Sequence, residues 1–272
     1  MRRPFRCAVG LLLAGVCAAA APACATRRYV PPAGPGTPFD EAAATWTAMT
    51  ARCRDARVFL AEIRVDGWVG ASRQRVPATM HGALTRGDDI YLEVPAPGRS
   101  VVQMAGRAGQ AVFLLPRDER VLRAASRDIV EALTGLRWGA RDLLNVLSGC
   151  VGDPSAAVTG QRYAQRAAIE LGAGVRAWAR QAAGAWHLEA ASRDGLLVEY
   201  LARDGAFPSV VRVTSTATDI TPLALTFRLT QVQANVDLGP GTFVLNVPDT
   251  FVPMTLEDLR ATRPLREGKT SP

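Results

Sequence analysis

Apolar and polar residues alternate with a period of two along much of this chain. Between residues 58 and 69, four apolar residues fall on the same side of such an alternation: Phe59, Ala61, Ile63 and Val65. The stretch from Leu223 to Gln231 repeats the pattern. A period of two predicts a strand with one face in a core and the other in water. Turn residues recur about every ten positions between such stretches, which predicts an antiparallel meander.

One stretch, Ser126–Cys150, departs from this pattern and predicts a pair of short helices. Its apolar residues recur at helical spacing: Ile129, Val130, Leu133 and Leu136, then Leu143, Leu144 and Leu147. We expect Ser126 to cap the first helix, residues 135–139 to join the two, and Gly149 to end the second. Because helices this short are marginal alone, their apolar sides must pack on the sheet.

A further helix is predicted before the first strand, from Asp40 to about Ala56. Thr37 and Pro38 suit its cap and first helical position. Four apolar residues then fall on one face, which we expect to pack against the sheet: Phe39, Trp46, Met49 and Cys53.

These elements together predict a mainly β fold with an α lid. The expected fold is a single antiparallel curved sheet, an open half-barrel of about eleven strands, covered by the helix pair and the N-terminal helix. The domain is expected to span residues 38–250, with Phe243–Val247 as its last strand, and residues 251–272 to form a polar C-terminal tail. Such a sheet encloses an apolar space, either filled by side chains or open to a ligand.

The first 37 residues resemble an export signal followed by a tether. Residues 1–23 combine three early arginines with an apolar run, as in a signal peptide. Small residues then precede Cys24, which resembles a lipobox whose cysteine is acylated. The alternative is an ordinary cleavage site and secretion to the periplasm. Residues 24–37 are rich in proline and glycine and predict a flexible tether, and Ala25 resembles the sorting signal for the outer membrane, on its periplasmic side.

Charge and motifs argue against several functional classes. The net charge of +7 includes the three leader arginines, so the remainder is only mildly basic and we expect no nucleic acid partner. His81 and His187 fall on the polar phases of their strands and predict solvated side chains. No metal-ligand spacing, phosphate loop or nucleophile motif is present in the sequence. We therefore expect neither an enzyme nor a cofactor, and a monomer.

Two cysteines, Cys53 and Cys150, lie outside the leader. In an oxidising envelope they can form a disulfide between the N-terminal helix and the end of the helix pair. The alternative is two free, buried thiols. Sequence alone does not decide whether their Cα atoms come within bridging distance.

The order of these parts resembles the LolA/LolB family of lipoprotein carriers and receptors. The most specific segments are Ile90–Gly98, with its proline turn, Ala132–Leu136 ("LTG" in its middle) and Asp142–Gly149 ("L…LxG"). The resemblance implies an open β-barrel with a helical lid, and a cavity for acyl chains or lipoproteins, with a periplasmic carrier as a possible partner. It departs from LolB in the turn 95–98, which lacks an exposed leucine for touching the membrane.

The resemblance also favours particular side chains as the cavity wall. Expected lining residues are Ile63, Leu92, Met104, Phe113, Ile129, Leu133, Leu143, Leu147, Leu188, Leu225, Phe227 and Leu229. The function it implies is a lipid-anchored envelope protein that handles lipoproteins or lipids. The alternative, from the residues alone, is a tethered structural or interaction module with a filled core.

Overall fold

The computed structural model describes residues 28–152, 158–239, 241–262 and 264–266. The expected signal peptide and Cys24 lie outside these residues. The chain divides into two compact units, residues 1–30 and 31–272, and the sheet, the helices and the core all belong to the second.

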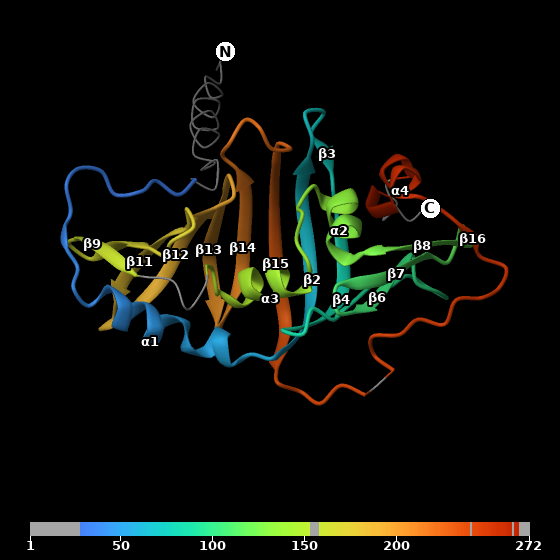
Figure 1. Ribbon diagram of the computed structural model, residues 1–272, viewed down its shortest axis with the longest axis horizontal. Coiled ribbons are helices and arrows are strands. Elements are labelled where there is room, and N and C mark those ends of the chain that lie inside the picture. The colour runs from blue at the N-terminus through green and yellow to red at the C-terminus, as the bar shows by residue number, and fades with distance from the viewer. Residues whose placement is uncertain (1–27, 153–157, 240, 263, 267–272) are drawn as a thin grey trace, which may run out of the picture. The chain divides into compact units, whose positions relative to one another are not determined.

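Within the described residues, sixteen strands form one curved sheet that does not close (Figure 1). Every neighbouring pair is antiparallel except the last, in which β16 runs parallel to β8. In order across the sheet, the strands are β1 (Thr37–Pro38), β9 (Thr159–Tyr163), β10 (Arg166–Glu170), β11 (Arg176–Ala182), β12 (Ala185–Arg193), β13 (Leu196–Asp204), β14 (Phe207–Ser215), β15 (Leu223–Ala234), β2 (Val58–Val69), β4 (Ala78–Thr85), β5 (Ile90–Val94), β6 (Val102–Arg107), β7 (Gln110–Leu115), β8 (Arg120–Ala125) and β16 (Val252–Pro253), with β3 (Gln74–Arg75) beside the end of β2.

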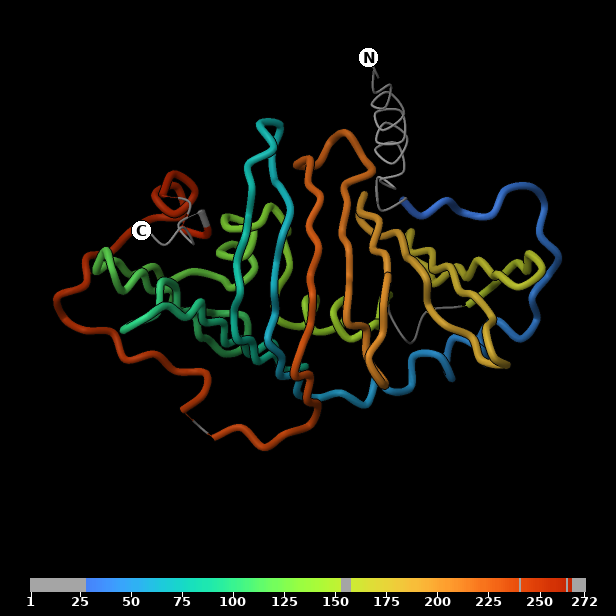
Figure 2. Tube along the Cα trace, turned by 180° about the vertical axis from the view of Figure 1, so that it is seen from behind, coloured from blue at the N-terminus to red at the C-terminus, as the bar shows by residue number. Residues whose placement is uncertain are grey.

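The centre of the sheet is the pair β2 and β15, the two longest strands. Their register pairs Ile63 with Leu229 and Val65 with Phe227, so apolar side chains of both strands share one face. Figure 2 shows the two strands side by side from behind. Because β15 follows all the other long strands in sequence, this pairing joins the two meanders into one sheet.

The helices lie on one face of this sheet. They are α1 (Ala42–Asp55), α2 (Ser126–Thr134), α3 (Ala140–Ser148) and α4 (Leu256–Thr262), with a short 3₁₀ turn, η1 (Pro264–Arg266), after α4. The pair α2 and α3 connects β8, near one edge, with β9, near the other. That connection must cross the sheet, so the two helices run over the face that carries the apolar side chains (Figure 1).

Glycines end both crossing helices, as the sequence predicted. Gly135 follows α2 with φ +73° and Gly149 follows α3 with φ +91°, both in the left-handed region that glycine tolerates best. Ser126 does not cap α2: it is the first helical residue, and no side chain caps that end.

One apolar core joins the sheet to the helices. Phe59, Phe113, Ile129 and Leu144 are fully buried in it. It extends to both halves of the sheet and includes Trp46 of α1, which confirms the expected inward face of that helix.

The fold class is confirmed, but the strand count is higher than eleven. Strands such as β9 and β11 escaped detection because arginine, glutamine and alanine interrupt their alternation. The expected strand Phe243–Val247 was wrong, since these residues form turns and irregular chain. Thr37 and Pro38 do not begin a helix either: they pair with β9, and α1 starts four residues later.

The C-terminal stretch also differs from the expected polar tail. Val252–Pro253 adds β16 to the sheet, and α4 packs beside α2. Met254, Leu259 and Leu265 are buried. These three apolar residues are too widely spaced to give a clear period in sequence, but they anchor the stretch in the core.

Candidate functional site

A small apolar cavity lies between the helix pair and the centre of the sheet. Its volume is about 60 Å³. The wall comes from β2, β4, β5, β6, β7 and β15 on the sheet side, from α2 and α3 above, and from η1 of the C-terminal stretch. The cavity therefore lies between the sheet and the two helices, where α2 and α3 cross the face of the sheet.

The cavity wall offers no free polar group. Thr134 is its one polar residue, and the Thr134 hydroxyl donates a hydrogen bond to the Val130 carbonyl at 2.8 Å. A cavity needs polar partners to hold water, and apolar cavities stay dry and take apolar guests. The chemistry of this wall therefore suits a hydrocarbon.

Eight of the twelve residues expected to line a cavity lie in this wall: Ile63, Leu92, Met104, Phe113, Leu133, Leu143, Leu147 and Phe227. The other four do not. Ile129, Leu225 and Leu229 are buried in the packed core, and Leu188 is buried on β12, in the other half of the sheet.

Several lining residues were missed. Met80 and Leu84 fall on the apolar phase of β4, and Val94 shares the phase of Leu92 on β5. Alternation alone was therefore enough to include them. Leu265 carried no such signal, because it is a single apolar residue in a polar stretch of the sequence.

The lining leucines of the helix pair differ in burial. Leu147 is 1% exposed and Leu143 is 7% exposed, so both belong to the core as well as to the cavity. Leu133 on α2 is half-buried. Leu133 therefore lies at the boundary between the cavity and the surface.

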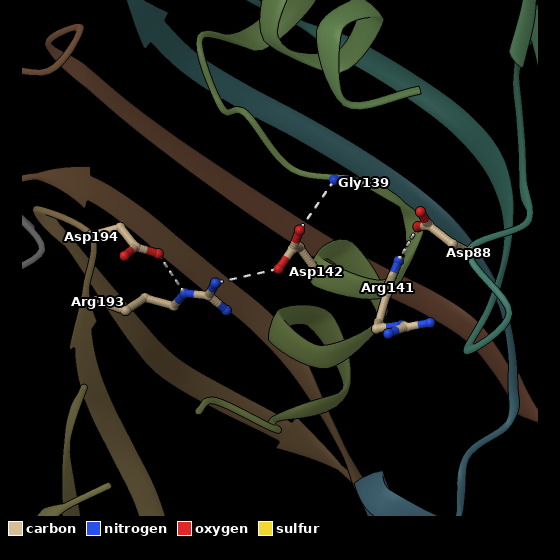
Figure 3. A network of polar contacts seen from close by, with 6 residues as sticks. All are labelled: Asp88, Gly139, Arg141, Asp142, Arg193 and Asp194. Carbon is tan, nitrogen blue, oxygen red and sulfur yellow. Dashed lines mark hydrogen bonds and ion pairs between the residues drawn. The ribbon is translucent and has the colours of Figure 1, made fainter. Parts of the chain in front are cut away.

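Polar contacts fix the start of α3 to the sheet from both sides (Figure 3). Asp88, in the turn between β4 and β5, accepts a hydrogen bond from the Arg141 backbone N–H at 3.1 Å. Arg193, at the end of β12, pairs with Asp142 at 3.3 Å and with Asp194 at 3.1 Å. Asp142 also accepts from the Gly139 backbone N–H at 3.3 Å. This network joins α3 to strands on either side of the sheet centre.

The rest of α3 is held equally firmly. The Tyr200 hydroxyl on β13 donates to the Val146 carbonyl at 3.1 Å, and burial raises the pKa of Tyr200 far above its ordinary value, so this donor keeps its proton. Arg86 donates to the Asn145 side chain at 3.3 Å. The chain just after α3 is tied to α1 by the disulfide Cys53–Cys150, whose Cα atoms are 5.6 Å apart.

Helix α2 has far fewer polar contacts with the sheet. Among the described residues, the hydrogen bond from the Ser126 N–H to the Gly109 carbonyl, at 2.8 Å, ties its first residue to the turn between β6 and β7. Its carboxylates Asp128 and Glu131 pair with Arg137, just beyond its own C-terminus. The lid over the cavity therefore has one fixed helix, α3, and one helix, α2, held mainly by apolar packing.

The turn after β5, expected to lack an exposed leucine, presents Pro95, Pro97 and Gly98 to solvent. Beside it, Glu93 accepts hydrogen bonds from the Tyr91 hydroxyl at 2.6 Å and from the Ser100 hydroxyl. These bonds lower the pKa of Glu93, the Ser100 contact most. Burial, with the bond to Glu93, raises the pKa of Tyr91 to about 12.

His81 and His187 are exposed on their strands, as their sequence phase predicted. Within the ranges given above, no three His, Cys, Asp or Glu side chains are grouped closely enough to hold a metal ion. No helix of the described chain is both long and apolar enough to cross a membrane.

An unclosed antiparallel sheet with a helix pair across its apolar face is the architecture that the LolA/LolB resemblance implied. The sheet and its helix pair therefore agree with the fold expected from the resemblance to the LolA/LolB family. No protein-family model and no curated protein matches the sequence.

Three solved structures resemble this one and are distant from it in sequence. A LolA superfamily protein from Nitrosomonas europaea is 10% identical, with TM-score 0.48, over 74% of this chain and 98% of that one. A DUF1329 family protein from Desulfovibrio piger is 11% identical, with TM-score 0.45, over 76% and 98%. A domain from Vibrio parahaemolyticus named as an outer membrane lipoprotein-sorting protein is 11% identical, with TM-score 0.39, over 75% and 96%.

Proposed function

We propose that this chain is a lipid-anchored envelope protein that binds an acyl chain beneath its helix pair and takes part in lipoprotein localisation or lipid handling at the outer membrane. The observation that carries the proposal is the cavity between α2, α3 and the sheet, whose wall has no unsatisfied polar group. Burying a methylene there contributes roughly 0.8 kcal/mol, so several methylenes suffice for useful affinity.

Under this proposal, the small volume of the cavity corresponds to a closed state of the protein. Ligand pockets usually measure about 300–1,000 Å³, whereas this cavity measures about 60 Å³. An acyl chain therefore requires a wall to move. The polar contacts of α3 oppose its movement, whereas α2 lacks comparable contacts with the sheet in the described residues. We infer that α2 moves and that α3 stays.

The proposal is tested on residues 25–272, exported behind a cleavable signal and purified without detergent. Native mass spectrometry is expected to detect co-purified lipid, and a fluorescent fatty acid is expected to bind at one site. Leu133→Glu should weaken that binding, because it places a carboxylate at the boundary of the cavity. The matched control Leu201→Glu alters a leucine that is already 45% exposed and should change nothing.

The small volume also favours a second candidate, a tethered structural or interaction module with a filled core. Under that alternative, no lipid co-purifies and no apolar probe binds, although the protein unfolds cooperatively. That pair of results would exclude lipid binding and leave the structural role.

The membrane anchor is a separate prediction, and it concerns a residue outside the described ranges. We expect Cys24 to be acylated, because the small residues before it resemble a lipobox. A lipoprotein cysteine carries more than one acyl chain, which stable anchoring in a membrane needs. Cys24→Ser should abolish metabolic labelling by a fatty acid. Labelling that persists in this variant would contradict the anchor while leaving the cavity untouched.

A further inference from the structure

A second hollow, the entrance groove, adjoins the apolar cavity, and we propose that it binds the anionic head group of the lipid whose chain enters the cavity. The ligand would be an amphiphile with a phosphate or carboxylate, placed at the end of α2. This inference rests on the proposed function and adds the chemical class of the ligand.

The entrance groove lies between the end of α2, the β2–β3 hairpin and the C-terminal stretch. Its volume is about 220 Å³, larger than the cavity. Leu133 and Leu265 line both hollows. The two spaces therefore meet at these two leucines, with a polar, open compartment on one side and a dry, apolar one on the other.

This division matches the two parts of an amphiphile. Transfer of a hydrocarbon chain from water to the cavity is favourable, whereas a charged head group must keep polar partners. The entrance groove supplies such partners next to the point where a chain would pass the leucines.

The charges of the entrance groove favour an anion. Arg75 on β3 and Arg260 on α4 both contribute to its wall. Arg75 pairs with Asp66 at 3.2 Å, but both side chains are more than half exposed, and such pairs are weak. Glu131 is the one acidic residue of the wall, and Arg137 lies 3.8 Å from it. Guanidinium groups bind phosphate and carboxylate through paired donors.

The position of Arg260 is set by the anchoring of α4. Leu259 is fully buried, and Asp258 pairs with Arg120 of β8 at 3.6 Å. The Thr255 backbone N–H donates to Asp258 at 2.8 Å, which caps the start of the helix. Arg260 therefore projects from a helix fixed to the sheet.

Leu265 follows this anchored helix and fills the boundary between the two hollows. It is 8% exposed, although η1 is only three residues long. In the ligand complex, the acyl chain takes the place of the Leu265 side chain, while α4 and Arg260 remain where they are. Displacement of Leu265 adds to the space that movement of α2 opens.

The experiment uses two probes with the same oleoyl chain, lysophosphatidylglycerol and monooleoylglycerol, on residues 25–272. Binding is measured by competition with a fluorescent fatty acid below the critical micelle concentrations. The phosphate-bearing probe should bind more tightly, and its advantage should shrink as salt is raised. Arg260→Gln and Arg75→Gln should each weaken it by up to about fivefold and leave the neutral probe unchanged.

Two further variants complete the test. Arg64→Gln alters an exposed arginine of β2 that does not line the entrance groove; it is the matched control and should affect neither probe. Leu265→Ala should strengthen the binding of both probes, because it opens the boundary that the chain must cross.

The outcomes separate this inference from the proposed function. Equal binding of the two probes, insensitive to both arginine variants, would overturn the head-group site while supporting the acyl-chain cavity. Failure of both probes and of the fluorescent fatty acid would overturn the proposed function itself. Weaker binding by Leu265→Ala would exclude displacement of that side chain.

Discussion

At the scale of single residues, the cavity wall contains leucines with two different roles. Leu147 is fully packed, whereas Leu133 is half-buried and faces both the cavity and the entrance groove. How tightly a leucine is packed determines what its truncation costs, because a truncated core side chain leaves a void that its neighbours do not fill.

We expect Leu147→Ala to lower the free energy of unfolding by about 2–5 kcal/mol. Leu133→Ala should lower it by about 1 kcal/mol or less, because water already reaches this side chain. Urea denaturation followed by circular dichroism measures both values. Leu143, at 7% exposed, should behave like Leu147. Equal losses at Leu133 and Leu147 would show that Leu133 is an ordinary core residue.

Glu93 provides a pH-dependent contribution at the same scale. Hydrogen bonds from Ser100 and Tyr91 hold its pKa below the ordinary value of 4.5. A carboxylate with a lowered folded-state pKa stabilises the protein above its unfolded-state pKa, and this contribution disappears as pH falls through the lowered value. The difference in unfolding free energy between the wild type and Glu93→Gln should therefore be largest above about pH 5 and shrink towards about pH 3.

The matched control for this titration is Glu257→Gln, at the exposed start of α4. This variant removes a carboxylate outside the cluster of Glu93, Tyr91 and Ser100, and it is measured in the same way. A Glu93→Gln difference that stays constant with pH would contradict the contribution assigned to its ionised form.

At the scale of elements, the helix pair is asymmetric. Side chains from β12 and β13 and from the turn after β4 contact α3, and a disulfide follows it. Helix α2 is instead packed by apolar contacts and by α4. Segments held by few polar contacts open more often than the rest of a fold.

We expect backbone amides in α2 to exchange hydrogen faster than those in α3, measured by mass spectrometry on the ligand-free protein. Replacing both Cys53 and Cys150 by alanine should speed exchange in α3 and leave α2 unchanged, because the disulfide constrains only the former. Slower exchange in α2 than in α3 would contradict the assignment of α2 as the moving helix.

At the scale of the whole sheet, each edge is formed by a very short strand that covers a longer one. β1 pairs with β9, and β16 pairs with β8. Hydrogen bonds from the Val252 and Met254 N–H groups reach the Glu119 and Val121 carbonyls, each at 2.8 Å. A long unpaired strand edge is a template for association with another chain, and short edge strands reduce that risk.

Deleting residues 251–272 should therefore cause self-association, because it exposes the edge of β8 and removes the buried Met254 and Leu259. Size-exclusion chromatography with light scattering measures the outcome. The control deletion of residues 264–272 retains β16 and α4 and should remain monomeric. A monomeric 251–272 deletion would show that β8 needs no cover.

An element could be predicted from the sequence only where its pattern of apolar residues extends over several positions. The helix pair was found because seven apolar residues recur at helical spacing between Ser126 and Gly149. β1 and β16 were missed because two residues cannot show a period, and their partners are distant in sequence, as with Thr37 and Arg162. Eight of the twelve expected residues lie in the cavity wall because strand phase and helical spacing predict which side chains face inward, but not which of those meet a void.

The sequence by itself determined the class of fold and the inward faces of its elements. Local periodicity and turn residues act on neighbours in the chain, so they are legible without coordinates. Only the tertiary structure decided between a disulfide and two free thiols at Cys53 and Cys150, and placed Leu265 in the cavity wall. Those outcomes depend on distances between segments far apart in sequence, which the packing of the whole sheet and its helices sets.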